Sequence, residues 1–372
     1  MRIGFDAKRA FFNTSGLGNY SRNCIDLLRK NSPETELVLF TPRVPNSLPE
    51  FATHPSIEVV YPNHGGKITE WLWRTHGMSK SASKCNIDLY HGLSNEIPLG
   101  LNKRNIPCVV TIHDLIFLRY PELYRSVDRK IYHAKSLASC KYADAIIAVS
   151  KQTKEDIINF YGIKPQKIEI IYQNCNPKFA EKISESEMQT VKDKYKIPEN
   201  YILFVGTIEE RKNVITILKA MQRFGIDKPL LLVGKATPYV NTIIGYAENN
   251  HIEDKLFIRH QIPDADMPAI YQMADVFVYP SIFEGFGIPV LEAITSGVPV
   301  ITSNISSLPE AAGPHSILTD PASVEMLGKS IIKVLNDSDL RANMIGMGYQ
   351  HAQLFSEKAI AEKLINLYHS LI

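Results

Sequence analysis

The chain has 372 residues, 41 Lys and Arg against 39 Asp and Glu, and a formal net charge of +2. That length exceeds what a single hydrophobic core usually organises, so two domains are expected. A hydrophobic fraction of 45% with 22% charged residues excludes a disordered or fibrous chain, and the small net charge argues against nucleic acid as the main partner.

Neither a membrane span nor an export signal is expected. No stretch approaches the about 18 to 20 apolar residues of a spanning helix, and the start, MRIGFDAKRAFF, lacks the basic segment and apolar run of a secretory signal. The scattered cysteines, without any Cys-x-x-Cys pair, favour reduced structural thiols in a cytoplasmic protein over a zinc site. They are Cys24, Cys85, Cys108, Cys140 and Cys175.

The first half of the chain alternates short aliphatic runs with amphipathic stretches. The runs predict strands at 2–7, 36–41, 57–62, 88–92, 108–114, 145–150 and 168–172. The stretches predict helices at 19–30, 127–142 and 151–161. Apolar strands separated by helices are typical of a parallel sheet covered on both faces.

The same alternation restarts after a polar segment at 174–201, where we expect a domain boundary near Asn176 and a surface helix. The second series predicts strands at 201–207, 229–234, 255–260, 276–281 and 299–304, and helices at 213–224, 238–249 and 266–273. The tail from Ala322 predicts two or three helices, the last over 356–371. The pattern therefore predicts an α/β protein with two doubly wound domains, which bind ligands at the carboxyl ends of their strands.

The most distinctive segment is PSIFEGFGIPVLEAITSGVPVIT, residues 280–302. A strand ends there, a glycine-rich turn follows, and a helix is expected to start near Pro289, since proline suits a first helical turn. Glu284 precedes the turn and Glu292 lies about one turn into the helix. Carboxylates accept hydrogen bonds from sugar hydroxyls, so the two can clamp a polyhydroxylated ligand. By spacing alone, Glu292 fits equally well as a residue that favours the helix dipole.

FEGFGIPVLEA resembles the Glu-x7-Glu signature of the family-4 retaining glycosyltransferases, followed by Gly-Val-Pro-Val at 297–300. The resemblance implies the GT-B fold, in which two Rossmann-like domains face each other across a cleft. It also implies a nucleotide-diphosphate sugar as donor, with no cofactor and no metal. It assigns Glu284 to orienting the donor sugar and Glu292 to the ribose hydroxyls. The turn between them, Gly285, Phe286 and Gly287, is included in the donor site.

The same resemblance gives the domain organisation. Residues 1–176 form the acceptor-side domain, and 177–355 form the domain that binds the nucleotide sugar. Residues 356–372 form a last helix that packs back on the first domain.

FVGTIEERKN, residues 204–213, places two cations between a strand and a helix. On their own, Arg211 and Lys212 fit a solvated charge run, although two such cations can also neutralise a diphosphate. In the family a lysine at the position of Lys212 contacts the donor phosphates. Thr207 replaces an arginine that many members carry, and we expect Arg211 to supply the missing charge.

Two segments of the first half also match the family. Gly16 and Gly18 lie in FNTSGLGNYS, which we expect to be a loop before a helix, and the resemblance puts Gly18 at the donor phosphates. His113 ends a strand in TIHDLIFLRYPE, where a structural, hydrogen-bonded histidine is the simpler interpretation. The resemblance instead puts His113 beside the transferred sugar, with His91 as a weaker candidate on the acceptor side.

Residues 67–80, KITEWLWRTHGMSK, contain Trp71 and Trp73 among basic residues. Such a surface suits a lipid-linked acceptor or a membrane, but we expect the tryptophans to pack in the core. Residues 1–176 carry 23 Lys and Arg against 16 Asp and Glu, which leaves open a peripheral contact with the inner face of a membrane.

The combined hypothesis is a metal-independent hexosyltransferase with His113, Glu284 and Lys212 as catalytic residues. GTIEERKN together with HDLIFLRYPE looks most like mannosyltransferases that build bacterial surface polysaccharides. GDP-mannose is therefore the expected donor and a glycan or lipid-linked glycan the acceptor, with a UDP-sugar as the nearest alternative. An epimerase, a non-catalytic GT-B protein, and a glycoside hydrolase using Glu284 and Glu292 remain competing readings.

Overall fold

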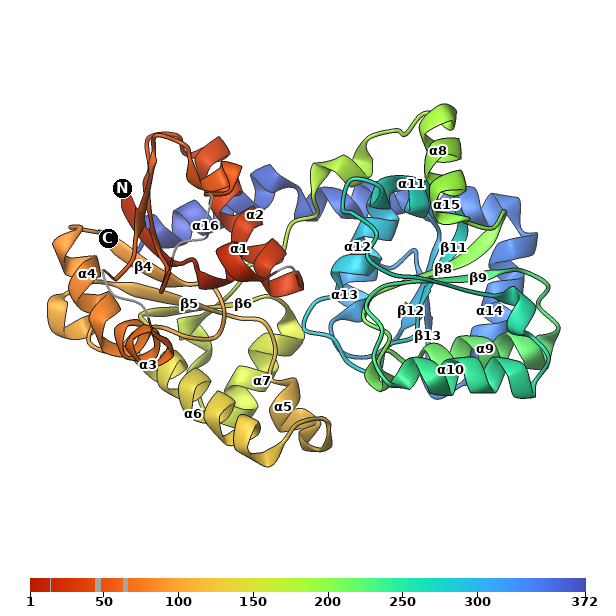
Figure 1. Ribbon diagram of the computed structural model, residues 1–372, viewed down its shortest axis with the longest axis horizontal. Coiled ribbons are helices and arrows are strands. Elements are labelled where there is room, and N and C mark those ends of the chain that lie inside the picture. The colour runs from red at the N-terminus through yellow and green to blue at the C-terminus, as the bar shows by residue number, and fades with distance from the viewer. Residues whose placement is uncertain (14, 44–47, 63–65) are drawn as a thin grey trace. The chain divides into compact units, whose positions relative to one another are not determined.

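The computed structural model describes residues 1–13, 15–43, 48–62 and 66–372, without the side chains of Lys67 and Ile68. The chain forms two compact units (Figure 1). The first unit contains Met1–Asn174 and Glu357–Ile372, and the second contains Cys175–Ser356. Within the described ranges, no helix combines the length and the apolar character needed to cross a membrane.

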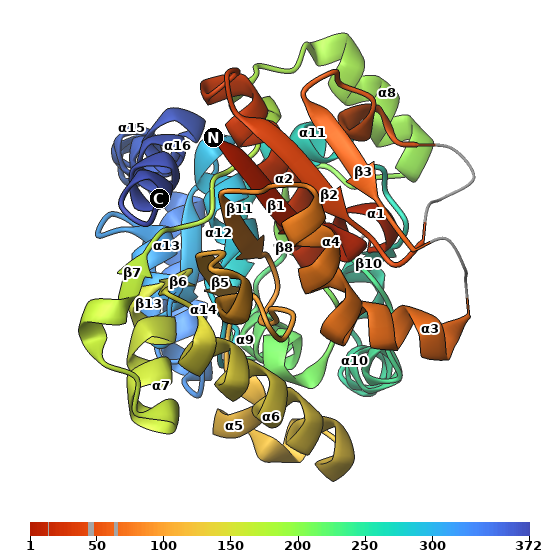
Figure 2. The same ribbon diagram turned by 90° about the vertical axis from the view of Figure 1, so that its left-hand side faces the viewer.

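The first unit is built on a parallel sheet with the order β3-β2-β1-β4-β5-β6-β7. Figure 2, in which this unit faces the viewer, shows β3, β2 and β1 side by side. The strands are β1 (Arg2–Asp6), β2 (Glu36–Phe40), β3 (Ile57–Val60), β4 (Leu89–Gly92), β5 (Cys108–Ile112), β6 (Ala145–Ala148) and β7 (Ile168–Ile170). Each lies within a predicted range, so the aliphatic runs were correctly interpreted as strands.

Both faces of this sheet are covered, because alternate residues of one strand pack into different clusters. In β2, Leu37 and Leu39 join one core cluster, and Val38 and Phe40 join the other. The helices of the first unit are α1 (Lys8–Phe12), α2 (Gly16–Asn31), α3 (Lys67–Leu72), α4 (Met78–Lys84), α5 (Ile116–Arg119), α6 (Ser126–Tyr142), α7 (Lys151–Tyr161) and α16 (Glu357–His369). A π-helical turn, Trp73–Gly77, joins α3 to α4.

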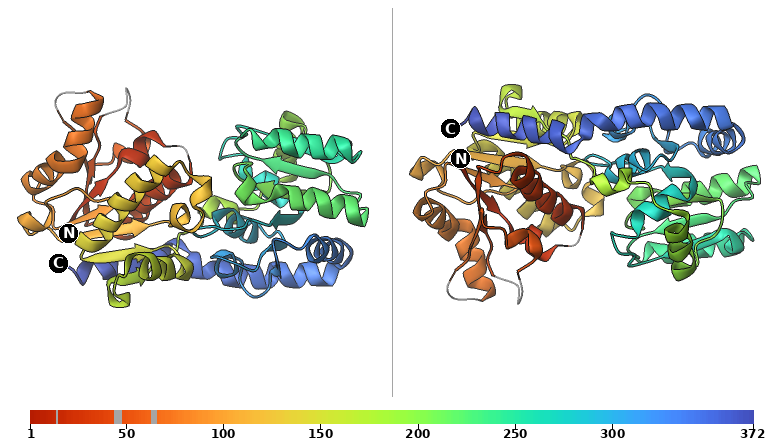
Figure 3. Two further views of the ribbon diagram at one scale, coloured as in Figure 1. Left: turned by 90° about the horizontal axis from the view of Figure 1, so that it is seen from below. Right: turned by 90° about the horizontal axis from the view of Figure 1, so that it is seen from above.

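The last helix, α16, belongs to the first unit although it is more than 180 residues further along the chain. It packs against α2, and Ile360, Leu364 and Tyr368 are part of the same core cluster as Ile25 and Leu28. In both views of Figure 3 this dark blue helix carries the C-terminus close to the N-terminus.

The second unit has a parallel sheet with the order β10-β9-β8-β11-β12-β13. Its strands are β8 (Tyr201–Val205), β9 (Leu230–Val233), β10 (Leu256–Arg259), β11 (Ala274–Tyr279), β12 (Val300–Ser303) and β13 (Ile317–Thr319). The last was not predicted, because it is a three-residue edge strand without an aliphatic run of its own. The helices are α8 (Glu185–Tyr195), α9 (Val214–Phe224), α10 (Tyr239–Asn249), α11 (Met267–Gln272), α12 (Ile288–Thr295), α13 (Leu308–Ala312), α14 (Val324–Asn336) and α15 (Ser338–Ala352).

The sequence between the units and at the tail also follows the expected pattern. The surface helix α8 begins with a capping box, in which Ser184 and Glu187 satisfy each other's backbone N–H groups. The tail contains three helices, α14 to α16, at the upper end of the expected number. The division between units at Asn174 and Cys175 lies close to the boundary expected at Asn176.

Candidate active site

The segment after β11 forms a buried cluster of charged and hydroxyl groups in the second unit. Glu284 is 8% exposed and Lys212 is 9% exposed, and their Oε1 and Nζ atoms lie 2.5 Å apart. The Tyr279 hydroxyl accepts a hydrogen bond from Lys212 Nζ at 2.6 Å and donates one to Glu284 Oε1 at 3.1 Å. Ser281 Oγ donates to the same carboxylate oxygen at 2.7 Å. The cluster therefore pairs two buried opposite charges and surrounds them with polar partners, as buried ions require.

Arg211 adds a second cation to this cluster. Its guanidinium lies 3.0 Å from Glu284 Oε1 and 2.6 Å from Glu209 Oε1, and it also donates to the carbonyl of Phe283. Although burial opposes it, the attraction of Glu284 and Glu209 raises the pKa of Arg211. Arg211 is therefore always a cation, shared between one buried and one more exposed carboxylate.

Burial and charge act in opposite directions on Glu284. Burial alone would raise the pKa of its carboxyl group, but Lys212 and Arg211 together lower that pKa to about 2. Burial lowers the pKa of Lys212, and the attraction of Glu284 offsets part of that effect. At neutral pH the cluster therefore contains the ionised carboxylate of Glu284 and the cations Arg211 and Lys212. The carboxylate of Glu209, which pairs with Arg211, balances the second cation.

The turn that carries Glu284 is fixed by its backbone. Ser306 Oγ accepts from the N–H of Glu284 at 3.0 Å, and Ser307 Oγ donates to the carbonyls of Glu284 and Phe286, both at 2.8 Å. Gly287 precedes α12 with a φ of 116°, a conformation that side chains other than glycine's rarely adopt. Pro289 lies in the first turn of α12, so the predicted start of this helix is confirmed.

Glu292 has a different environment from Glu284. The Tyr271 hydroxyl donates to Glu292 Oε2 at 2.8 Å. Burial raises the pKa of Glu292 to about 7, although this hydrogen bond counteracts the shift. Near pH 7 the two glutamates of the motif thus differ in ionisation: Lys212 and Arg211 keep Glu284 ionised, whereas burial leaves Glu292 partly protonated.

In the first unit, His113 lies directly after β5 and is 5% exposed. Its Nε2 lies 2.9 Å from the carbonyl oxygen of Leu93, and its ring packs edge-on against Tyr20 with centroids 4.6 Å apart. Burial lowers the pKa of His113 to about 4, so the ring is neutral at pH 7. Because a carbonyl can only accept, Nε2 carries the ring proton and Nδ1 is left as an acceptor.

A chain of hydrogen bonds connects the last helix to the surroundings of His113. Tyr368 of α16 lies 2.6 Å from His91 Nδ1, and His91 Nε2 lies 2.8 Å from Thr111 Oγ1. Thr111 in turn lies 3.0 Å from the Tyr20 hydroxyl. His91, expected as a weak acceptor-side candidate, is fully buried, and both of its ring nitrogens lie within hydrogen-bond distance of protein hydroxyls.

The prediction of a loop at Gly16 and Gly18 was wrong. Both residues lie in the first turn of α2, and the Gly18 N–H donates to the carbonyl of Ser15 at 2.9 Å. A Cβ atom at Gly18 would lie 1.8 Å from the carbonyl oxygen of Asn13. The glycine is therefore required by the close approach of the preceding backbone. Thr14, in the same segment, lies outside the described residues.

The expected core packing of the tryptophans was wrong for Trp71, whose exposure is 56%. Trp73 is partly buried against one core cluster of the first unit. Ser150 caps α7 by accepting from the Thr153 N–H at 3.0 Å. All five cysteines are free thiols.

Sequence reasoning brought Arg211, Lys212 and Glu284 forward, and the structure joins them in one cluster. It missed their hydroxyl partners Tyr279 and Ser281. The available signal was that both residues lie at or just after the end of β11, a few positions before Glu284, because open α/β sheets bind ligands at the carboxyl ends of their strands. Tyr271 and Tyr20 come from other elements and carry no such local signal.

Two family models match most of the chain between them. The model described as Glycosyltransferase Family 4 matches residues 14–177, and that described as Glycosyl transferases group 1 matches residues 187–351. The O-antigen chain mannosyltransferase B of Escherichia coli is 29% identical over 387 residues, which cover 100% of this chain and 100% of that protein.

Solved structures that resemble the full chain include the following two. A sucrose-phosphate synthase from Thermosynechococcus elongatus has a TM-score of 0.80 and 22% identity, covering 100% of this chain and 99% of that one. HepE from Anabaena, in complex with UDP-glucose, has a TM-score of 0.76 and 18% identity, covering 100% of both chains. At these identities the likeness establishes the fold. With its two parallel-sheet units and both family models, the chain belongs to the family-4 glycosyltransferases and has the GT-B fold.

Proposed function

We propose that this glycosyltransferase transfers mannose from GDP-mannose to a glycan hydroxyl during polysaccharide synthesis, with retention of configuration and without a metal ion. The buried cluster of Lys212, Arg211 and Glu284 is the observation that carries the proposal. Mannose is supported by the full-length similarity to the E. coli O-antigen mannosyltransferase. A UDP-sugar is the second candidate, favoured by the structural likeness to HepE in complex with UDP-glucose.

The cations of the cluster would stabilise the leaving group. As the bond between the sugar and the nucleotide diphosphate breaks, negative charge develops on the departing phosphate oxygens. Lys212 and Arg211 are both held near Glu284, and a diphosphate can compete with this carboxylate for their N–H groups. Fixed cations in a buried site lower the barrier electrostatically, which is the work that a divalent metal does in other transferases.

Glu284 would then turn from the cations towards the hydroxyls of the donor sugar. An ionised carboxylate accepts two or more hydrogen bonds, and contact with Lys212 and Arg211, which lowers the pKa of Glu284 to about 2, keeps it ionised until the donor enters. Glu292 would accept from the ribose, with Gly285, Phe286 and Gly287 forming the backbone between these contacts. The contact of Gly18 with the donor phosphates remains a prediction.

His113 would contact the sugar as a neutral ring. With Nε2–H bound to Leu93, Nδ1 can accept a hydrogen bond from a sugar hydroxyl and hold the reacting carbon in place. No covalent intermediate is needed if the acceptor hydroxyl attacks on the face from which the diphosphate leaves, and this route retains the anomeric configuration.

Calorimetric titration of GDP-mannose, UDP-glucose and free mannose tests the donor. We expect GDP-mannose to bind, Lys212→Met to weaken it by about 10- to 100-fold because a charge-assisted contact is lost, and Lys219→Met on the exposed face of α9 to have no effect. Failure of GDP- and UDP-sugars alike to bind would end the transferase proposal.

Activity measurements test the chemistry. We expect His113→Ala to lower kcat by about 100-fold or more, while His54→Ala, at an exposed position, leaves kcat unchanged. NMR of the product should show an α-linked mannose, and transfer should persist in excess EDTA. An inverted product, EDTA inhibition or an unimpaired His113→Ala enzyme would each contradict one named part of the mechanism.

A further inference from the structure

Four polar side chains form a row through the first unit, from α16 towards the end of β5. The Tyr368 hydroxyl lies 2.6 Å from His91 Nδ1, and His91 Nε2 lies 2.8 Å from Thr111 Oγ1. Thr111 Oγ1 lies 3.0 Å from the Tyr20 hydroxyl, which ends this polar row. Tyr368, His91 and Thr111 are fully buried, whereas Tyr20 is partly exposed. The three buried groups must therefore satisfy their hydrogen bonds within the row.

The direction of donation along the polar row follows from the number of protons. Burial lowers the pKa of His91 to about 3, so at neutral pH its ring carries one N–H. In the described part of the chain, His91 is the single hydrogen-bond partner of the Tyr368 hydroxyl, and a buried O–H without an acceptor is costly. Tyr368 therefore donates to Nδ1, and the ring proton of His91 lies on Nε2.

The same reasoning extends beyond His91. Its Nε2–H donates to Thr111 Oγ1, and the one proton of the Thr111 hydroxyl then goes to the Tyr20 oxygen. The reverse direction would leave the proton of the fully buried Tyr368 without an acceptor, which is unfavourable. In the favoured direction, only the proton of the partly exposed Tyr20 is left over. Each hydroxyl and ring nitrogen in the row thus has one defined role.

Two routes lead from His91 to His113. On the first route Thr111 holds the hydroxyl of Tyr20, and the Tyr20 ring packs edge-on against the His113 ring with centroids 4.6 Å apart. On the second route the carbonyl of Leu93, two positions after His91, accepts from His113 Nε2 at 2.9 Å. The His113 ring is thus held by a ring contact and by a hydrogen bond, and both of these supports connect to His91.

Resting on the proposed function of His113 at the transferred sugar, we propose that Tyr368 and His91 are positioning residues for this histidine. The hydroxyl on the last helix fixes the ring of His91. His91 in turn fixes the Tyr20 ring and the Leu93 carbonyl, which together hold His113 with Nδ1 available to the sugar. Both positioning residues are fully buried, so they act on sugar transfer through His113 alone.

Removal of a single hydroxyl tests the row. Tyr368→Phe keeps the buried ring and removes the donor to His91 Nδ1. We expect kcat to fall about 5- to 10-fold, while the Kd for GDP-mannose stays unchanged because the donor cluster belongs to the other unit. Tyr161→Phe is the matched control, since the buried Tyr161 hydroxyl contacts Ser136 within the same unit, and its kcat should equal that of the wild type. Equal falls in kcat in the two variants would overturn the proposal.

A double-mutant cycle separates positioning from a general loss of structure. In a His113→Ala background the row has no histidine to position, so adding Tyr368→Phe should leave the residual kcat unchanged. A further fall of about 5- to 10-fold in that background would show that Tyr368 does not act through His113. Thr111 provides a second comparison, because Thr111→Ser keeps the hydroxyl and should retain kcat, whereas Thr111→Val removes it and should lower kcat as Tyr368→Phe does. Thermal unfolding checks that each variant folds.

NMR of the histidine ring nitrogens measures the row without any substrate. We expect His91 and His113 both to carry their proton on Nε2, and we expect Tyr368→Phe, but not Tyr161→Phe, to shift the ring signals of both. Spectra of His91→Gln and His113→Ala assign these signals among the eleven histidines. His113 signals that stay in place in Tyr368→Phe would refute the positioning role, even in an active transferase. Signals that move in a protein without transferase activity would uphold the row and refute the proposed function instead.

Discussion

At the scale of single residues, the cluster of Lys212, Arg211 and Glu284 is arranged so that buried charges compensate each other. Lys212 and Glu284 are both about nine-tenths buried, which would be costly for either ion alone. Each is stabilised by the other and by the Tyr279 hydroxyl. A lysine can thus be held away from water before any ligand arrives, provided that a carboxylate accompanies it.

Glu284→Gln should therefore destabilise the folded protein. Removing one partner of a buried pair leaves Lys212 and Arg211 under-compensated, and we expect a loss of about 3 kcal/mol in the free energy of unfolding of the second unit. Glu209→Gln is the control, since Glu209 pairs with the same arginine but is more exposed, and its loss should be below about 1 kcal/mol. Urea unfolding of both variants gives the comparison, and equal losses would contradict the special role of burial.

Glu292 should make the free energy of unfolding fall as the pH rises. A carboxylate paired with cations, such as Glu284, has the opposite effect. Burial raises its folded pKa to about 7 from an ordinary 4.5, so the folded state binds a proton that the unfolded state releases. This contribution is complete below about pH 4.5 and is lost as the pH rises towards 7. Because Glu292 is only partly buried, we expect about 1 to 2 kcal/mol of it to be measurable. Urea midpoints at pH 5 and pH 8 should differ less in Glu292→Gln than in the wild type.

At the scale of secondary-structure elements, α16 completes the core of the first unit. Leu364 is 3% exposed and Tyr368 is fully buried, where its hydroxyl contacts His91. The hydrogen bonds continue from His91 through Thr111 to Tyr20, the ring that packs on His113. Through this chain of hydrogen bonds, α16 helps to hold in place the Tyr20 ring that packs against His113.

Leu364→Ala should lower the stability of the first unit by about 2 to 4 kcal/mol, because it leaves a cavity in a core that packs α16 on α2. Glu362→Ala, on the exposed side of the same helix, should change stability by less than about 0.5 kcal/mol. Denaturant unfolding followed by tryptophan fluorescence reports on the first unit alone, since Trp71 and Trp73 both belong to it. A loss no larger than that of the control would mean that α16 docks only loosely.

At the scale of the whole molecule, one unit is continuous in sequence and the other is not. Residues 175–356 expressed alone should unfold cooperatively, because that unit contains its entire sheet. Residues 1–174 alone should lack cooperative unfolding and regain it when a peptide of residues 357–372 is added. Calorimetry of the two fragments, with and without the peptide, checks both expectations. A cooperative transition of residues 1–174 alone would show that α16 is dispensable.

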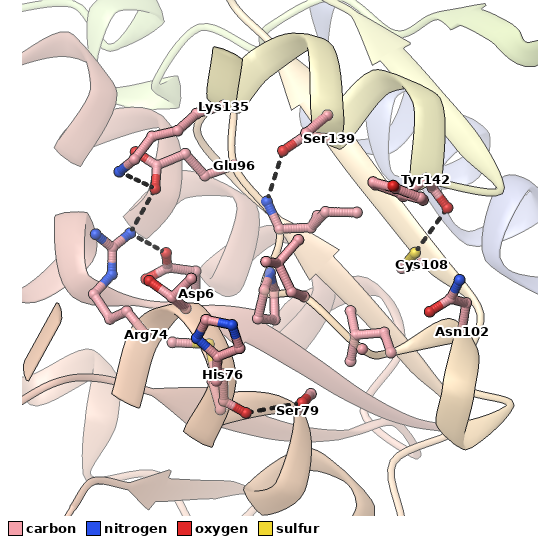
Figure 4. A pocket seen from close by; sticks show the side chains of 18 of the residues that line it. Asp6, Arg74, His76, Ser79, Glu96, Asn102, Cys108, Lys135, Ser139 and Tyr142 are labelled. Atoms are coloured by element: carbon pink, nitrogen blue, oxygen red, sulfur yellow. Dashed lines mark hydrogen bonds and ion pairs between the residues drawn. The ribbon is translucent and has the colours of Figure 1, made fainter. Parts of the chain in front are cut away.

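Local sequence patterns predicted the elements well and the contacts poorly. The strands were recognisable because a buried parallel strand is a continuous aliphatic run, as in residues 201–205 and 230–233. The first turn of α2 was misread, because two glycines usually mark a loop and the close approach of Asn13 is visible only in three dimensions. Lys212 and Glu284 are 72 positions apart, so only the family resemblance suggested that they belong together. Nothing local indicated a cavity of the first unit, whose lining includes Asp6, Cys108 and residues from 71–80, 96–104 and α6 (Figure 4).

The division of the first unit between the two ends of the chain has a consequence for its synthesis. All residues of the second unit have been synthesised once Ser356 has been added, whereas the first unit also needs residues 357–372. During that interval the face of α2 that α16 will cover is left exposed, and chaperones can bind there. A message that ends shortly after Ser356 would produce a protein with an intact second unit and an unfinished first one. Such a product would keep the cluster of Lys212 and Glu284 but lack a finished first unit, so the proposed activity is expected to require residues 357–372.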